Sequence, residues 1–260
     1  MIAVFGASLR YRVAVAELAR TARTSDQQRG AVCVVGGETW WIDARNALDA
    51  GAAAIVVERP RVASAEDLSE LEDVADGRPV VIERPHLRED AVHDLIPSQP
   101  KALVVECAYP SDDVVVLRDA VGWVRVLGTG TPRIVSSMGS GGRAVAALSV
   151  SATGGLASGQ DVPVSLVVAR RRSAAIWLRA TVLGADRLDV LVVAAPGDPR
   201  VTRTTVDGRT LRTEPRESAP RRALRRAAEA VGNGTRLDDL EPLRADDVIA
   251  RAVVTSAPKT

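Results

Sequence analysis

Short apolar runs alternate with amphipathic stretches along the first 110 residues. Five runs predict β-strands: IAVFG (2–6), AVCVVGG (31–37), AAIVVERP (53–60), PVVIERP (79–85) and KALVVECAYP (101–110). The stretches between them predict helices at 11–23, 39–51, 64–77 and 86–96. Strands that are apolar throughout and separated by helices are typical of a parallel sheet covered on both faces. This half therefore predicts a Rossmann-like α/β domain, in which Ser64 and Asp67 form a capping box.

Beyond about residue 120 the pattern changes to longer β-type runs separated by Gly, Asp and Pro turns. The runs lie at 122–128, 132–139, 143–153, 162–171, 173–184, 186–197 and 201–214. The VDGR turn at 206–209 is typical of a β-hairpin. Helices return only near the end, at 219–234 and 244–254. We expect an α+β domain with a large open, mainly antiparallel sheet at 119–260, after a Rossmann-like domain at 1–118.

Two of the predicted strands end in nearly the same string. One ends at Glu58-Arg59-Pro60 and the other at Glu83-Arg84-Pro85. Ligands of α/β proteins bind outside the carboxyl ends of the strands, so either string can mark an active site.

Charge and composition exclude several classes of function. The 34 basic and 33 acidic side chains leave a formal charge of +1, and aromatic residues make up 3% of the chain. We therefore expect no nucleic-acid or anionic-membrane partner. No apolar run has transmembrane length and the first apolar run is too short for a signal peptide, so we expect a cytoplasmic protein. Cys33 and Cys107 lie singly in apolar runs and are interpreted as buried hydrophobic residues, and no metal site is predicted.

Several strings follow one another in an order that resembles a known family. PVVIERP with HLREDAVHDL resembles the Glu-Lys-Pro strand, and the helix after it, that close the Rossmann domain of the Gfo/Idh/MocA (glucose-fructose oxidoreductase / inositol dehydrogenase) family. AIVVERP and its surroundings match that region about as well, so both alignments stay open. The segment at 104–137 resembles the family's crossover into its second domain, and 223–254 resembles its C-terminal helix pair. The resemblance implies a dinucleotide site and acid/base groups.

The cofactor site implied by the resemblance is only partly present. In GASLRYR (6–12), Gly6 is kept, but Ser8 and Tyr11 replace the second and third glycines of G-x-G-x-x-G. Ser8 and Arg10 are candidates to contact a phosphate. Glu38, after the second predicted strand, is a candidate ribose ligand or else a turn carboxylate. The expected cofactor is thus NAD(P) or none.

The catalytic groups that the resemblance implies are also altered. The chain has two lysines, Lys101 and Lys259, and arginine stands in the middle of both signature candidates. Arginine stays protonated and cannot serve as an ordinary general acid. The string GSGGRAVAALSVSATGG, expected to carry the family's histidine, has none. The remaining catalytic candidates are Glu83, Arg84, His86 and Tyr109, and for His86 the alternative is a solvent-facing residue at a helix start.

Three hypotheses follow. The first is a catalytically degenerate homologue of these oxidoreductases that serves as a binding or partner subunit. It would form a homo-oligomer, or pair with an active family member, through its C-terminal sheet. The second is an active NAD(P)-dependent oxidoreductase with a rebuilt site for a sugar-like, keto or imine substrate, in which Arg84 polarises a carbonyl and His86 or Tyr109 moves a proton. The third, a non-redox enzyme, has no supporting constellation.

Overall fold

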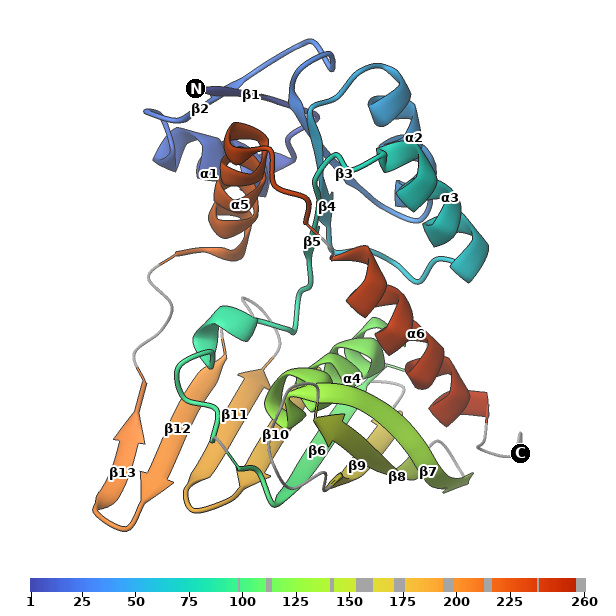
Figure 1. The fold of residues 1–260 in the computed structure, drawn as a ribbon, viewed down its shortest axis with the longest axis vertical. Coiled ribbons are helices and arrows are strands. Elements are labelled where there is room, and N and C mark those ends of the chain that lie inside the picture. The colour runs from blue at the N-terminus through green and yellow to red at the C-terminus, as the bar shows by residue number, and fades with distance from the viewer. Residues whose placement is uncertain are drawn as a thin grey trace. The chain divides into compact units, whose positions relative to one another are not determined.

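The computed structural model describes residues 1–97, 99–110, 114–140, 143–152, 161–170, 176–193, 199–212, 217–237 and 239–255. The chain forms two compact units (Figure 1). Unit 1 comprises Met1–Pro85 and Arg216–Arg244, and unit 2 comprises His86–Pro215 and Ala245–Thr260. This division differs from the expected boundary at 118/119, because residues 86–118 belong to unit 2 and residues 216–244 belong to unit 1.

Unit 1 is built on a five-stranded parallel sheet with the order β2-β1-β3-β4-β5. Its strands are β1 (Ile2–Phe5), β2 (Ala22–Thr24), β3 (Val32–Gly36), β4 (Ala54–Glu58) and β5 (Val80–Glu83). The strand order reverses at β1, so the switch point of this doubly wound sheet lies between β1 and β3. The Rossmann-like prediction for this half is confirmed.

Helices cover both faces of this sheet, as the apolar strands predict (Figure 1). One face packs against α2 (Trp40–Asp49) and α3 (Ala65–Ala75), and the other against α1 (Leu9–Glu17) and α5 (Ala219–Asn233). The predicted capping box of α3 is present, because the Ser64 hydroxyl accepts from the Asp67 backbone N–H and the Asp67 carboxylate accepts from the Ser64 N–H.

Two predicted helices of this half are wrong in extent. The helix expected at 11–23 ends at Glu17, and the edge strand β2 follows it. Pairing with β1 satisfies the backbone of β2, and Ala22 is buried. The helix expected at 86–96 is a single 3₁₀ turn, η1 (Glu89–Ala91).

Unit 2 contains an eight-stranded sheet with the order β13-β12-β11-β10-β6-β9-β8-β7. Its strands are β6 (Ala102–Tyr109), β7 (Gly130–Ser140), β8 (Arg143–Ala152), β9 (Val162–Arg170), β10 (Trp177–Leu183), β11 (Arg187–Val193), β12 (Arg200–Thr205) and β13 (Gly208–Leu211). Within the described part of this sheet only the pair β6–β9 is parallel, so the mainly antiparallel prediction is confirmed. The predicted hairpin joins β12 to β13.

The strand β6 was expected to be the fifth strand of the parallel sheet, and the structure places it inside the second sheet. It pairs with β10 on one side and with β9 on the other along most of its length. Leu103, Val105 and Cys107 lie in the core of unit 2. An apolar strand is compatible with either sheet, so its sequence alone does not choose between them.

The run GWVRVLG at 122–128 was expected to be a strand but forms the second half of α4 (Val114–Gly128). This helix packs along β6, β7, β8 and β10, where packing outweighs the strand preference of its valines. Gly128 permits a close approach, since a Cβ atom there would lie 2.9 Å from Val150. The last helix, α6 (Leu240–Thr255), supplies Leu240 and Leu243 to a core of unit 1 and Ala250 and Val253 to the core of unit 2.

Candidate functional site at the sheet edge of unit 1

The two Glu-Arg-Pro strings come together at the carboxyl edge of the parallel sheet. Glu58 ends β4, Glu83 ends β5, and the two residues are paired neighbours in the register of the strands. The two strings are therefore not alternative sites, because both carboxylates belong to one candidate site.

Helix α1 contributes a guanidinium and a phenol to this pair of carboxylates. The Arg10 Nη1 donates to Glu58 Oε1 over 2.9 Å and its Nη2 donates to Glu83 Oε1 over 3.0 Å. The Tyr11 hydroxyl donates to Glu83 Oε2 over 2.6 Å. We call these four residues the Arg10 cluster. Each oxygen of the Glu83 carboxylate has a donor on α1.

The cluster is mostly shielded from water. The side chain of Glu83 is 3% exposed, that of Glu58 17% and that of Arg10 38%. Burial by itself lowers the pKa of Arg10, but Glu83 and Glu58 outweigh this effect and the pKa is raised from its ordinary value. Burial, followed by the charge of Glu83, raises the pKa of the Tyr11 phenol well above its usual range. Tyr11 is therefore a hydrogen-bond donor and not an acid catalyst at neutral pH.

The turn from β1 into α1 places these groups. Gly6 has a φ of +71°, and a Cβ atom there would lie 2.7 Å from the Val34 carbonyl oxygen, so the turn requires glycine. Ser8 takes the N-cap position of α1 without a side-chain capping bond. Its Oγ is buried and has no hydrogen-bond partner among the described residues. Tyr11 is fully buried in the core beneath α1.

The arginines of the two Glu-Arg-Pro strings, Arg59 and Arg84, are described by their backbone conformation and the exposure of their side chains. Arg59 has a φ of +49°, in the left-handed region that a non-glycine residue rarely adopts. Its backbone N–H donates to the Glu83 carbonyl oxygen over 3.1 Å, which ties β4 to β5 just beyond the carboxylates. The side chain of Arg59 is exposed, whereas Arg84 is buried. Local strain of this kind is found most often at functional sites.

Glu38 does not follow the second strand of unit 1. The short strand β2 is second in the chain, so Glu38 follows the third strand, β3. Its exposed carboxylate lies 3.3 Å from Arg61 Nε. Ser25 and Asp26 are the residues that directly follow β2, the second strand.

His86 and Tyr109 belong to unit 2, whereas the Arg10 cluster belongs to unit 1. The backbone N–H of His86 donates to Asp119 Oδ2 over 3.0 Å, and its carbonyl oxygen accepts from the Trp123 indole over 2.7 Å. Helix α4 thus holds the backbone of His86 from two positions one turn apart. Tyr109 is fully buried in the core of unit 2. The string expected to carry the family's histidine forms β8 over 143–152, and residues 141–142 and 153–155 lie outside the described residues.

Unit 2 contains a buried polar cluster that was not predicted from the sequence. Arg118, Asp119 and Asp246 are completely buried, and Asp247 nearly so. Arg118 Nε lies 3.4 Å from Asp119 and 3.8 Å from Asp247, and Arg125 lies 3.4 Å from Asp246. The available signal was a charged pair inside the otherwise apolar stretch VVVLRDAVGW, because charges on a buried helix are kept only with partners.

Both cysteines are buried, as interpreted from the sequence, whereas the absence of a metal site stays a prediction. Cys33 and Cys107 are buried and not in a disulfide, and burial raises their pKa to about 11 and about 12. They are therefore unreactive thiols at neutral pH, as interpreted from the sequence. Within the described ranges no group of three His, Cys, Asp or Glu side chains could hold a metal ion. In the same ranges no helix combines the length and the apolarity needed to cross a bilayer.

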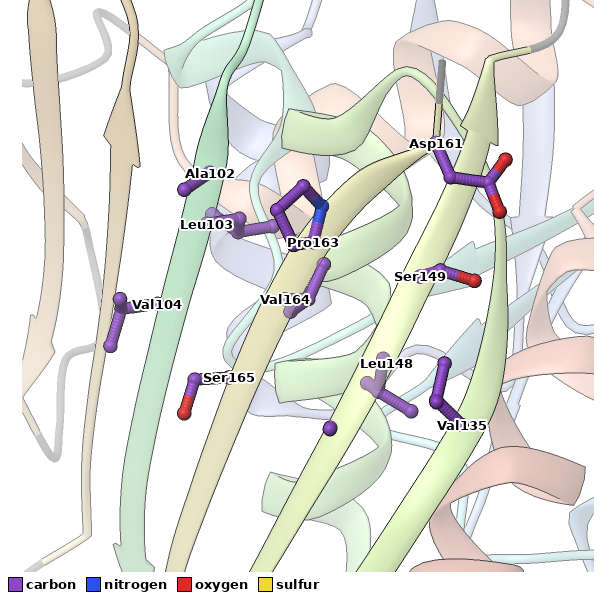
Figure 2. Close-up of a pocket in the computed structure, with 11 residues that line it drawn as sticks. Ala102, Leu103, Val104, Val135, Leu148, Ser149, Asp161, Pro163, Val164 and Ser165 are labelled. Carbon is purple, nitrogen blue, oxygen red and sulfur yellow. The ribbon is translucent and has the colours of Figure 1, made fainter. Parts of the chain in front are cut away.

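The eight-stranded sheet has one face packed on α4, and no described helix packs against the other, which we call the uncovered face. Four large apolar side chains are exposed there at one end of the sheet: Val135, Met138, Val145 and Val167. An adjoining pocket has a volume of about 450 Å³. It is lined by residues of β6, β7, β8 and β9 that include Val104, Val135, Ser149 and Ser165 (Figure 2). Asp161 lies at its rim and accepts from Ser151 and Arg133.

The structure is similar over nearly its whole length to solved dehydrogenases. UDP-N-acetylglucosamine 3-dehydrogenase GnnA from Acidithiobacillus ferrooxidans matches with a TM-score of 0.69 at 15% identity, over 98% of this chain and 97% of that chain. KijD10, a 3-ketoreductase from Actinomadura kijaniata solved in complex with NADP, matches with 0.63 at 16%, over 98% and 97%. The dehydrogenase MviM from Clostridium difficile matches with 0.65 at 10%, over 98% and 90%. The chain has the fold of these dehydrogenases. No family model and no curated protein matches its sequence.

The residues at the sheet edge do not fit the dinucleotide that this fold implies. A pyrophosphate binds at the N-terminus of the helix after the first strand, where it meets amide groups and cations. Gly6 and the buried Ser8 hydroxyl suit such a group. Arg10, however, is shared by two carboxylates, and Tyr11 fills the position of the third glycine. A pyrophosphate would add negative charge beside Glu58 and Glu83.

Proposed function

We propose that this protein is a catalytically degenerate homologue of Gfo/Idh/MocA-type NAD(P)-dependent dehydrogenases that serves as a partner subunit. The observation that carries the proposal is the Arg10 cluster, in which the cation nearest the N-terminus of α1 is held by Glu58 and Glu83. The middle residue of both signature strings is arginine, which cannot exchange a proton at neutral pH. The protein then keeps the dehydrogenase fold without its chemistry.

The uncovered face is the surface through which we propose that it assembles, with a second copy as the partner. Antiparallel sheets exposed to water on one side normally alternate apolar and polar residues, but here Val145 and Val167 pair directly across β8 and β9 on the exposed side. Arg179, Arg187 and Asp189 form ion pairs farther along the same sheet. An apolar patch bordered by charged pairs is the composition expected of a protein interface.

An active oxidoreductase with a rebuilt site is the second candidate. The strained backbone of Arg59 at the end of β4 favours it, because such strain collects at active sites. KijD10, which shares the fold, was solved with NADP. In this reading Arg84 would orient a carbonyl and His86 or Tyr109 would move the proton.

A titration of the purified protein with NADPH and NADH, followed by nicotinamide fluorescence, separates the two candidates. We expect no saturable change up to about 1 mM cofactor, which corresponds to a binding free energy weaker than about −4 kcal/mol. Saturation in the micromolar range together with reduction of any keto sugar would refute the degenerate function. Sedimentation velocity on the same sample tests the assembly, for which we expect a dimer at micromolar concentration.

A further inference from the structure

The N-terminus of α1 has no anion of its own. The positive end of a helix is stabilised by acidic residues in its first turn, and α1 has none. Its first turn carries Arg10 instead, which adds a second positive charge at the same place. An isolated helix of this sequence would therefore start unfavourably.

The missing negative charge comes from two other elements. Glu58 and Glu83 reach the first turn of α1 from the ends of β4 and β5, and both oxygens of Glu83 accept from α1 side chains. We propose that these two carboxylates are an internal substitute for a bound anion, so that the Arg10 cluster holds α1 to the sheet edge in the absence of a cofactor. This inference rests on the proposed function, because it explains how the edge stays folded when it binds no dinucleotide.

The Arg10 cluster holds more negative than positive charge, which makes its stability depend on Arg10. Two carboxylates share one guanidinium, and Glu83 is nearly inaccessible to water. Without Arg10 the two carboxylates would be adjacent and without that counter-charge, so the folded protein would take up a proton to relieve the repulsion. Other charged residues on or beside these elements are Arg12 and Glu17 on α1, Arg59 and Arg84 at the strand ends, Glu38 and Arg61 beside β3 and β4, and Arg221, Arg222, Arg225, Arg226 and Glu229 on α5, which packs against α1.

The experiment compares Arg10→Gln with Arg12→Gln, a matched control on the same helix. Arg12 is exposed and its side chain makes no hydrogen bond or ion pair within the described residues. At about pH 8 we expect Arg10→Gln to lower the melting temperature of the full chain by roughly 5 °C. Hydrogen exchange of the α1, β4 and β5 peptides should rise in parallel. Arg12→Gln should match the wild type in both measurements.

The pH profile separates a charge effect from lost packing. In Arg10→Gln the pair of Glu58 and Glu83 has a raised pKa in the folded protein. The folded variant is therefore most stable below the unfolded glutamate pKa of about 4.3 and loses stability as the pH rises. The deficit relative to wild type should therefore shrink from about pH 8 to about pH 5. Adding Glu58→Gln to Arg10→Gln should recover most of the loss at pH 8. A deficit that is constant with pH, or that the second substitution does not relieve, would overturn the inference.

Arg10→Lys covers the case in which Arg10→Gln does not fold. Lysine keeps the positive charge but cannot bridge both carboxylates with a planar fork. We therefore expect a smaller loss of melting temperature than in Arg10→Gln, and a deficit that does not shrink from about pH 8 to about pH 5. A loss as large as complete failure to fold would contradict the inference. Cofactor titration of the wild type tests the proposed function independently, since tight NADPH binding would refute that function while the pH profile still reports on the cluster.

Discussion

The sheet edge of unit 1 and the uncovered face of unit 2 differ in whether their side chains have partners within the protein. At the edge, charged groups that could bind a ligand are satisfied by one another, as Arg10 is by Glu58 and Glu83. On the uncovered face, apolar groups that could be buried by a partner, such as Val145 and Val167, are exposed at 43% and 36%. The charged groups of the Arg10 cluster are paired with one another, whereas the apolar groups of the uncovered face are exposed to water. The two regions therefore bear on different parts of the proposed function, the edge on cofactor binding and the face on association.

The largest expected effect comes from placing charges on the uncovered face. Val145→Asp with Val167→Asp should weaken self-association at least about 100-fold, or about 3 kcal/mol, because two carboxylates would be desolvated in the interface. Sedimentation equilibrium measures the change. Val206→Asp, at the exposed tip of the β12–β13 hairpin, is the control and should leave the dimer unchanged. If the double variant remains dimeric, the face is not the interface.

A second prediction concerns the turn that positions the edge. Gly6→Ala should destabilise the protein by about 2 kcal/mol or more, because the new Cβ atom meets a backbone oxygen and the positive φ disfavours any side chain. Gly37→Ala provides the comparison, since it also has a positive φ but no atom within 4 Å of the added Cβ. Urea denaturation should rank the two variants in that order. Equal losses would show that only the backbone conformation matters.

Tyr11→Phe tests the buried hydrogen bond to Glu83. Loss of a bond to a charged acceptor should cost about 2 kcal/mol at neutral pH. The raised pKa of Tyr11 means that the folded state keeps the phenol protonated. Its stabilising contribution is therefore present below the unfolded pKa of about 10 and is lost as the pH rises above it.

The wild type should thus lose stability faster than Tyr11→Phe above about pH 10, as denaturation at several pH values will measure. The chain has two tyrosines, so absorbance titration of Tyr11→Phe reports Tyr109 alone. An ordinary titration midpoint that disappears with the substitution would contradict the assignment.

The smallest expected effect is a gain. Arg59→Gly should stabilise unit 1 by about 1 kcal/mol, because glycine adopts the left-handed conformation without strain and the exposed Arg59 side chain makes no hydrogen bond or ion pair with the described residues. Arg61→Gly, at a position without positive φ, should not stabilise the protein. If Arg59→Gly is destabilising, its side chain contributes a contact that outweighs the strain.

Particular residues show how far sequence reasoning reached. The alternation of apolar strands and helices predicted the parallel sheet, and the Asp207-Gly208 turn predicted a real hairpin. Gly6 was predicted as the turn residue of a cofactor site, and the structure gives it a conformation that requires glycine. Arg10 was predicted to contact a phosphate, but its two partners are separated from it by 48 and 73 residues. No local pattern encodes pairings over such distances.

The sequence by itself determined which segments can be buried, where the chain must turn, and which catalytic residue types are missing, because periodicity, glycine and composition are local properties. Only the tertiary structure decided that β6 joins the second sheet, that α4 is one helix, and that Glu58 and Glu83 lie side by side with Arg10 between them. These outcomes depend on competition among distant segments for the same partners. An apolar strand fits either sheet and a carboxylate fits many cations, and only the folded chain as a whole selects among them.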